Sequence, residues 1–132
     1  MDNQELIKLA IDAKEKSYSP YSNFRVGAAL LTKDGKVYQG ANIENAAYGV
    51  TICAERTAVF AAKLEGIDEF STIAVTSDSN DYIPPCGSCR QVLLELCGQE
   101  LEVLITNGNG EMKSLKLKEL LPFSFGDKNL NG

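Results

Sequence analysis

Residues 24–43 read Phe-Arg-Val-Gly-Ala-Ala-Leu-Leu-Thr-Lys-Asp-Gly-Lys-Val-Tyr-Gln-Gly-Ala-Asn-Ile, and this stretch predicts a β-hairpin. The run 24–32 is its first strand, and Val37 to Ile43 returns as the partner strand. Asp34-Gly35 predicts a tight turn between them, because Asp-Gly tolerates the positive φ that two-residue hairpins require. The hairpin supplies two antiparallel strands around which the rest of the chain can be placed.

Helices and strands alternate on both sides of this hairpin. Before it, apolar residues recur at helical spacing from Asn3 to about Tyr18, with Asp2 or Asn3 as the cap, and a loop follows at 19–23. After it we expect a polar loop at 44–52, a helix at 53–65 closed by Gly66, a strand at 70–76, a helix from about 86 to 97 ended by Gly98, strands at 101–106 and 112–117, and a helical turn at 118–121. This order predicts an α/β fold, a three-layer α/β/α sandwich with a mixed five-stranded sheet.

Length and composition limit the class of protein. A chain of 132 residues, 44% of them hydrophobic and 23% charged, fits one domain over residues 1–132. The net charge of -5 and the scattered basic residues argue against nucleic acid as a partner. No apolar run approaches the roughly 18 residues that span a bilayer, and the polar N-terminus differs from a signal peptide, so we expect a cytoplasmic protein and no membrane partner.

The chain has four cysteines and no histidine. A reducing compartment argues against disulfides, and the Cys86-x-x-Cys89 spacing is typical of metal or redox sites. Without histidine, the chain can use neither an imidazole base nor a zinc ligand of that type. The candidate chemistry therefore rests on thiols and carboxylates.

Two predicted helix starts carry these groups. Cys53 and Glu55 open one helix, and Cys86 and Cys89 lie on one face at the start of another, where Pro85 presets the backbone. First-turn side chains tilt toward the helix N-terminus, so two such ends aimed at one point would bring together three thiolates and a carboxylate. Three protein ligands with an open fourth position are typical of catalytic zinc.

Charge balance gives the neighbouring residues possible roles. Three thiolates leave Zn²⁺ with a net charge of -1, which would make a bound water less acidic. The two helix N-termini, with Arg56 and Arg90, could offset this charge and donate hydrogen bonds to the sulfurs. Glu55 would then accept a proton from water and pass it on, with a raised pKa if it is buried.

Other interpretations remain open from the residues alone. Cys97 fits a small core residue, but it could also be the fourth ligand of a structural zinc module that binds a partner. Cys86 and Cys89 could form a thiol redox pair that works without metal. Glu55 could be a solvated acid favoured by the helix dipole, and Arg56 and Arg90 could be ordinary exposed helix residues.

Three blocks of the sequence read Tyr-Ser-Pro-Tyr-Ser-Asn-Phe-Arg-Val-Gly-Ala-Ala at 18–29, Gly-Ala-Asn-Ile-Glu-Asn-Ala at 40–46 and Cys-Ala-Glu-Arg-Thr-Ala at 53–58. Together with Pro85-Cys86-Gly87-Ser88-Cys89, they resemble the cytidine deaminase family in its short, homotetrameric, zinc-dependent type. The cysteine-bearing segments look like the zinc deaminase signature in its three-cysteine form. The likeness runs from the first helix to about Phe125 and implies a cytidine deaminase-like fold.

The resemblance also implies roles for single residues. Cys53, Cys86 and Cys89 would hold one Zn²⁺ per subunit, Glu55 would be the proton shuttle, and Arg56 would hydrogen-bond ligand sulfurs. The substrate-binding residues would be Asn42 and Glu44 at the ribose hydroxyls, Phe24 against the pyrimidine, the Ala54 backbone N–H at the carbonyl oxygen, and Phe125 reaching into a neighbouring subunit's site. Gly49-Val50-Thr51 is given no role.

The expected reaction is hydrolytic deamination of cytidine, and of 2′-deoxycytidine, to the uridine product and ammonia in pyrimidine salvage. Zinc-bound hydroxide would attack C4 while Glu55 protonates N3. The carboxylate of Glu44 would repel a phosphate, so a free nucleoside fits better than a nucleotide. The resemblance implies a homotetramer with sites at subunit interfaces. A related aminopyrimidine nucleoside is the alternative substrate.

Overall fold

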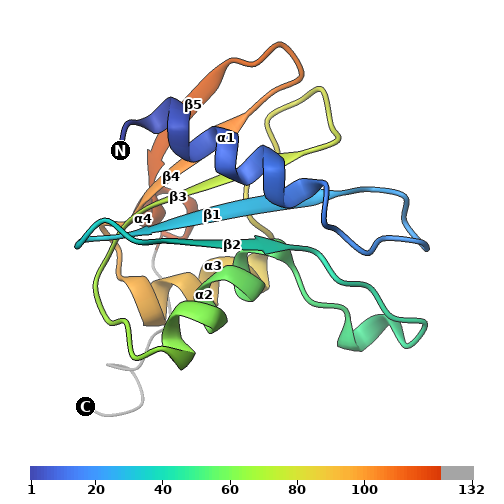
Figure 1. Cartoon of the computed structure of the whole chain (residues 1–132), viewed down its shortest axis with the longest axis horizontal. Coiled ribbons are helices and arrows are strands. Elements are labelled where there is room, and N and C mark those ends of the chain that lie inside the picture. Colours follow the sequence, from blue (N-terminus) through green and yellow to red (C-terminus); the bar gives the residue numbers. More distant parts are fainter. Residues whose placement is uncertain (123–132) are drawn as a thin grey trace.

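The computed structural model describes residues 1–122, and within them a five-stranded sheet lies between helices (Figure 1). The elements are α1 (Asn3–Lys14), β1 (Val26–Thr32), β2 (Val37–Ala41), η1 (Tyr48–Val50), α2 (Ala54–Leu64), β3 (Phe70–Ser77), α3 (Gly87–Cys97), β4 (Glu102–Thr106), β5 (Met112–Lys116) and α4 (Leu117–Leu120). The strand order is β2-β1-β3-β4-β5, and β3 and β4 form the parallel pair, whereas the other neighbours are antiparallel. The predicted mixed five-stranded sheet is confirmed.

Helices cover both faces of the sheet. In Figure 1, α1 crosses one face, and α2 and α3 lie side by side on the other. The strands serve both faces because alternate side chains point to opposite sides. Ala29 of β1 packs with Leu6 and Ala10 of α1, whereas Ala28 and Leu30 of the same strand belong to the core under α2 and α3. The three-layer α/β/α arrangement is therefore confirmed.

The sheet topology brings the starts of α2 and α3 together. Strand β1 is antiparallel to both β2 and β3, so β2 and β3 run in the same direction. Their carboxyl ends therefore lie at one edge of the sheet. Each of these strands is followed, after a loop, by the helix that covers the same face. Consequently the N-termini of α2 and α3 meet near that edge.

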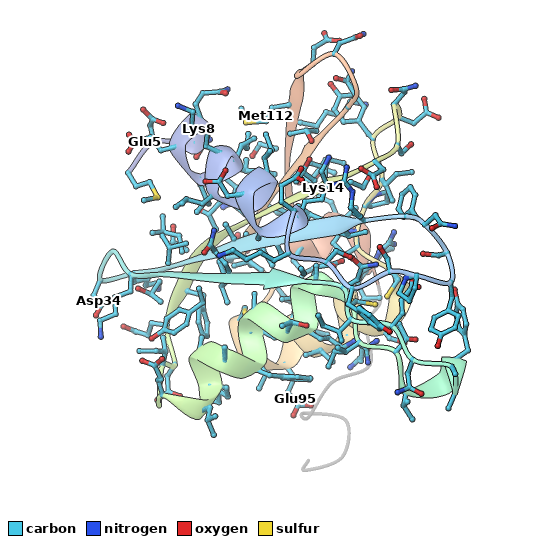
Figure 2. All side chains as sticks on the ribbon, turned by 45° about the vertical axis from the view of Figure 1, so that its right-hand side comes forward. Glu5, Lys8, Lys14, Asp34, Glu95 and Met112 are labelled. Carbon is cyan, nitrogen blue, oxygen red and sulfur yellow. The ribbon has the colours of Figure 1, made fainter. Side chains whose placement is uncertain are left out.

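The structure corrects three predicted boundaries. Helix α1 ends at Lys14 rather than near Tyr18, because the N–H groups of Lys16 and Ser17 bond to carbonyls only three residues back and the chain turns away. The first strand begins at Val26 and its partner ends at Ala41. Their turn, which projects with Asp34 near its tip (Figure 2), is not the predicted two-residue turn.

The hairpin turn is one residue longer than the prediction. The N–H of Thr32 donates to the carbonyl of Lys36, so three residues separate the two bonded ends. Gly35 has φ 95° and is the residue of this turn with positive φ. This is the pattern of a three-residue loop whose last member takes the left-handed conformation.

Candidate active site

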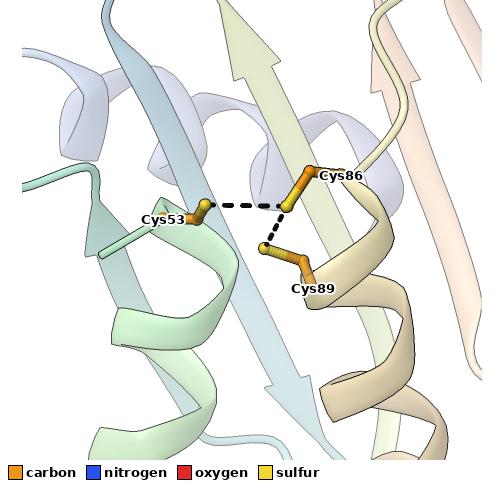
Figure 3. Close-up of side chains that lie close together, drawn as sticks. All are labelled: Cys53, Cys86 and Cys89. Carbon is orange, nitrogen blue, oxygen red and sulfur yellow. Dashed lines mark hydrogen bonds between the residues drawn. The ribbon is translucent and has the colours of Figure 1, made fainter. Parts of the chain in front are cut away.

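Three thiols converge where α2 and α3 begin. Cys53 is the N-cap residue of α2, Cys86 is the N-cap residue of α3, and Cys89 lies in the first turn of α3. The Sγ atom of Cys86 lies 3.7 Å from that of Cys53 and 3.2 Å from that of Cys89 (Figure 3). All three ligand atoms lie within 4.8 Å of one another. The predicted convergence of the two helix starts is thus present in the fold.

The donor set and its spacing fit a zinc ion. With Zn–S bonds of about 2.3 Å, two thiolates of a tetrahedral site stand about 3.8 Å apart. The sulfur separations between Cys53 and Cys86 (3.7 Å) and between Cys86 and Cys89 (3.2 Å) both lie below that value, and both exceed the roughly 2.05 Å of a disulfide. All four cysteines are free thiols. The cluster fits a three-cysteine zinc site in which the fourth tetrahedral position is left for a non-protein ligand.

Cys97 does not belong to this cluster. It closes α3, and it lies eleven positions after Cys86, which corresponds to about 16 Å along a helix. Its side chain packs against the core under α2 and α3, and burial raises the pKa of its thiol to about 12. The structure therefore places Cys97 as a core residue and contradicts the interpretation in which it is a fourth zinc ligand.

The environment of the thiols favours negative charge on Cys53. A hydrogen bond from Cys89 and the nearby guanidinium of Arg56 lower the pKa of Cys53 to about 5, against the opposing effect of burial. Arg56 Nη2 donates to Cys53 Sγ at 3.3 Å. In the same pair, the bond to Cys53 and burial raise the pKa of Cys89. Arg56 therefore lies where it can offset thiolate charge.

Arg90 does not take the predicted position beside the sulfurs. Its Nε donates to the carbonyl of Pro85 at 2.7 Å, and its Nη1 donates to the carbonyl of Leu120 at 2.8 Å. Both are backbone acceptors, so Arg90 ties the loop before α3 to the end of α4. It therefore holds the loop that precedes Cys86 and makes neither of these two hydrogen bonds to a sulfur.

Glu55 is buried in the first turn of α2, with only 4% of its surface exposed. Burial is the main cause that raises the pKa of its carboxyl group to about 7, and the negative charge of Cys53 adds to the effect. A solvated acid favoured by the helix dipole would be exposed. The buried position of Glu55 instead suits a group that accepts and releases protons near neutral pH.

A cavity of about 310 Å³ opens in front of Glu55 and the thiols of Cys53 and Cys86. Each predicted substrate-binding residue within the described range lines it, namely Phe24, Asn42, Glu44 and Ala54, whereas Phe125 lies outside the described residues. A larger groove of about 620 Å³ lies between α1 and the loops after β3 and β4, but it contains none of the predicted site residues. Chemistry rather than volume therefore identifies the site.

Several lining residues were missed by sequence reasoning. They are Ser22, Val26, Tyr48, Thr51, Ile52, Val75, Ser77, Ile83 and Pro84. Ser22 and Val26 fall inside a quoted sequence block, and Pro84 adjoins Pro85, so proximity to recognised residues could have identified them. Tyr48, Thr51 and Ile52 come from the loop that showed no period. Its position at the pocket depends on the bridge between Ile43 and Ile52, a non-local contact.

Asn42 and Glu44 are held by several hydrogen bonds. Asn42 Oδ1 accepts from the Val26 N–H at 2.9 Å, and Asn42 Nδ2 donates to the Phe24 carbonyl at 2.9 Å. The N–H groups of residues 21 and 22 each donate to Glu44 Oε1 at 3.1 Å. The Ser22 hydroxyl, which bonds to Glu44 Oε2, is the main cause that lowers the pKa of Glu44. Glu44 is therefore an ionised acceptor in the pocket.

Comparison with known proteins agrees with this arrangement. The family described as "Cytidine and deoxycytidylate deaminase zinc-binding region" matches residues 1–105. A cytidine deaminase of Halalkalibacterium halodurans is 53% identical over 99% of both chains, and one of Sporosarcina psychrophila is 45% identical over 99% of this chain and 96% of its own. The crystal structure of the Burkholderia pseudomallei cytidine deaminase superposes with a TM-score of 0.92 at 50% identity, covering 95% of this chain and 100% of that one.

The fold and the three-thiol centre define a zinc-dependent hydrolytic deaminase. More particularly, the chain belongs to the cytidine and deoxycytidylate deaminase family. The resemblance inferred from the three sequence blocks is thereby confirmed. Within residues 1–122 every helix is too short or too polar to cross a membrane.

Proposed function

We propose that this chain catalyses the hydrolytic deamination of cytidine, and of 2′-deoxycytidine, to the corresponding uridine and ammonia in pyrimidine salvage. The observation that carries the proposal is the buried carboxyl of Glu55 in the same cavity as Cys53 and Cys86, whose sulfurs lie in the three-thiol cluster. Relatives that match almost the whole chain are named cytidine deaminases. These findings together support a deaminase of a pyrimidine nucleoside.

Cys53, Cys86 and Cys89 are the proposed zinc ligands, with one ion per subunit. Zinc held in this way supplies a water molecule that is activated for attack on carbon. Arg56, through its hydrogen bond to Cys53 Sγ, reduces the negative charge that three thiolates place on the site. The starts of α2 and α3 add partial positive charge beside the sulfurs.

Glu55 moves the protons of the reaction. Its carboxylate accepts a proton from the attacking water and delivers it to N3 of the pyrimidine, while the water oxygen bonds to C4. A second proton, from the hydroxyl group now on C4, passes through Glu55 to the amino nitrogen. The bond from C4 to that nitrogen then breaks and ammonia leaves. The pKa of Glu55, raised to about 7, suits both acceptance and release of a proton near neutral pH.

The rest of the cavity binds the nucleoside in this proposal. Phe24 packs against the pyrimidine, the Ala54 N–H donates to its carbonyl oxygen, and Asn42 and Glu44 hold the sugar hydroxyls. The proposal is supported by the position of all four residues in the cavity wall. An ionised Glu44 accepts hydrogen bonds from hydroxyls and repels phosphate, which favours a nucleoside over a nucleotide.

The wider context belongs to the same proposal. We expect residues 1–132 to form a single domain, four chains to assemble as a homotetramer, and Phe125 to reach the site of a neighbouring subunit. We also expect a cytoplasmic protein without nucleic-acid or membrane partners. Analytical ultracentrifugation tests the assembly directly, and a single species with the mass of one chain would contradict it.

The decisive experiment follows the absorbance of cytidine after addition of zinc-loaded protein, with a chelated sample beside it. We expect rapid conversion by the loaded sample and none by the chelated one. If the protein converts other aminopyrimidine nucleosides but not cytidine, the proposed reaction stands and the proposed substrate is wrong. Equal conversion without metal, or no conversion of any of these nucleosides, would refute the proposal.

A further inference from the structure

The carboxylate of Glu44 is held by three donors from one loop. The N–H groups of Tyr21 and Ser22 both donate to Oε1 at 3.1 Å, and the Ser22 hydroxyl donates to Oε2. Glu44 is only 5% exposed, so these bonds replace most of its contact with water. An ionised carboxylate offers about four acceptor positions, of which three are taken here. One acceptor position remains, and it is on Oε2.

The side-chain amide of Asn42 also has most of its hydrogen-bonding positions occupied. Its Oδ1 accepts from the Val26 N–H at 2.9 Å and from the Ser17 hydroxyl at 2.5 Å, which uses both acceptor positions of the oxygen. Its Nδ2 donates one hydrogen to the Phe24 carbonyl at 2.9 Å. One N–H of Asn42 is left. The two residues together therefore offer one donor and one acceptor to the cavity that both line.

Ser22 connects this pair to the loop that shapes the cavity. Its Oγ accepts from the Phe24 N–H at 3.1 Å while its hydroxyl hydrogen goes to Glu44. The chain turns at Asn23, which has φ 55° and donates its N–H to the Ser19 carbonyl at 3.0 Å. Non-glycine residues in this region are uncommon and cluster at binding sites, where neighbouring contacts hold them. The single Ser22 hydroxyl thus fixes both Phe24 and Glu44.

We propose that Ser22 is a positioning residue for sugar recognition, and that it holds Glu44 so that the Asn42–Glu44 pair binds a single ring hydroxyl. That hydroxyl accepts from Asn42 and donates to Glu44, as one hydroxyl can do at the same time. A second ring hydroxyl finds no remaining group on this pair. The inference rests on the proposed nucleoside substrate and specifies how its sugar is recognised.

The test compares wild type and Ser22→Ala on cytidine, 2′-deoxycytidine, 3′-deoxycytidine and 2′,3′-dideoxycytidine. For Ser22→Ala we expect KM to rise about 10-fold for cytidine and for the one monodeoxy nucleoside that keeps the recognised hydroxyl. The reason is that Glu44 is no longer held in the orientation that binds this hydroxyl. The other monodeoxy nucleoside and the dideoxy nucleoside should show a smaller rise in KM, the same for both, because for them the variant removes only the hydrogen bond that supports Phe24 beside the pyrimidine. The kcat values should stay nearly constant, since Ser22 has no role in proton transfer.

Two further variants separate positioning from general disturbance. Ser114→Ala is the matched control, because the Ser114 hydroxyl also donates to a glutamate, Glu102 Oε2 at 2.6 Å, but neither residue lines the cavity. It should leave every KM unchanged. Ser22→Thr keeps the hydroxyl and should restore most of the affinity. Thermal unfolding of each variant shows whether it is folded.

Three results would overturn the inference: an equal rise in KM on all four nucleosides, an equal rise on the two monodeoxy nucleosides, or no rise on any. Failure of the proposed function would look different, because wild type would then not convert cytidine at all. In that case calorimetric binding of the four corresponding uridines, which carry the same sugars and cannot be deaminated, gives the same comparison between wild type and Ser22→Ala.

Discussion

Gly40 of β2 lies so close to Ala54 of α2 that a Cβ atom on Gly40 would stand 2.3 Å from the Ala54 carbonyl oxygen. The same Cβ atom would be 2.6 Å from the backbone nitrogen of Ala58. Both neighbours are backbone atoms, which cannot swing aside as a flexible side chain can. The absence of a side chain at position 40 therefore lets the first turn of α2, with Cys53 and Glu55, lie directly on the sheet.

Gly40→Ala should push the start of α2 away from the sheet and misplace Cys53. We expect a loss of about 1–3 kcal/mol in the free energy of unfolding, typical of overpacking, together with weaker zinc binding. Gly27→Ala is the control, because its Cβ would lie 2.1 Å from the Ala10 carbonyl oxygen of α1, on the opposite face. It should cost similar stability and leave zinc affinity intact. Chemical denaturation and competition with a chelator measure the two effects, and equal loss of zinc affinity in both variants would contradict the expectation.

Glu55→Ala should keep zinc and fold but lose nearly all turnover. General acid–base groups contribute about 10²- to 10⁴-fold, so we expect kcat to fall by at least that lower factor. Glu95→Ala is the control, because Glu95 is exposed on the side of α3 away from the sheet (Figure 2). Metal content and steady-state kinetics check both. A Glu55→Ala variant with the wild-type rate would remove the proton-transfer role.

Arg56→Ala should weaken the zinc site. Loss of the hydrogen bond to Cys53 Sγ leaves the thiolate charge unbalanced, and changes of this kind typically cost about 10- to 100-fold in metal affinity or activity. Arg90→Ala removes bonds to two backbone carbonyls instead, and we expect lower thermal stability as its main effect. Chelator competition and thermal unfolding separate the two arginines. Unchanged zinc affinity and activity in Arg56→Ala would exclude its proposed role.

The cysteine variants distinguish the zinc centre from the alternatives. Cys86→Ser and Cys89→Ser should release zinc, because each removes one of three thiolates. Cys97→Ser should retain the ion at full occupancy, since its side chain packs in the core. Metal content after dialysis measures all three. Release of zinc by Cys97→Ser alone would revive the structural zinc module.

Asp78 should contribute to stability in a defined pH range. Its carboxylate bonds to Arg25 and lies 3.4 Å from Lys14 Nζ, and the Arg25 hydrogen bond is the main cause that lowers its pKa from 3.8 to about 2. A carboxyl group whose pKa is lower in the folded state than in the unfolded state stabilises the protein at pH values above the unfolded-state pKa. This stabilisation is lost as the pH falls through the folded-state pKa. Near neutral pH the free energy of unfolding of wild type should exceed that of Asp78→Asn by roughly 1 kcal/mol. The difference is no larger because solvent screens this partly exposed group. The difference should vanish between about pH 4 and pH 2, and a constant difference in acid unfolding experiments would argue against the ion pair.

Local sequence determined much of this protein. The spacing Cys53-Ala-Glu55 and the Pro85-Cys86-x-x-Cys89 segment predicted two helix starts that carry zinc ligands, and both are present. Capping residues and apolar periodicity act over a few neighbouring residues, so helices and strands could be predicted with small errors at their ends. The blocks containing Asn42 and Glu44 likewise identified residues that line the cavity.

Only the tertiary structure decided which groups meet. Because β1 is antiparallel to both β2 and β3, the helices that follow β2 and β3 begin at one edge, and the thiols come together there. The same long-range packing turned Arg90 toward the Leu120 carbonyl, brought Thr51 into the cavity wall and aimed Ser22 at Glu44. These contacts join residues far apart in the sequence, so no local pattern specifies them. The chemistry of the ligands could be predicted from the sequence, whereas the pocket around them is a product of the folded sheet.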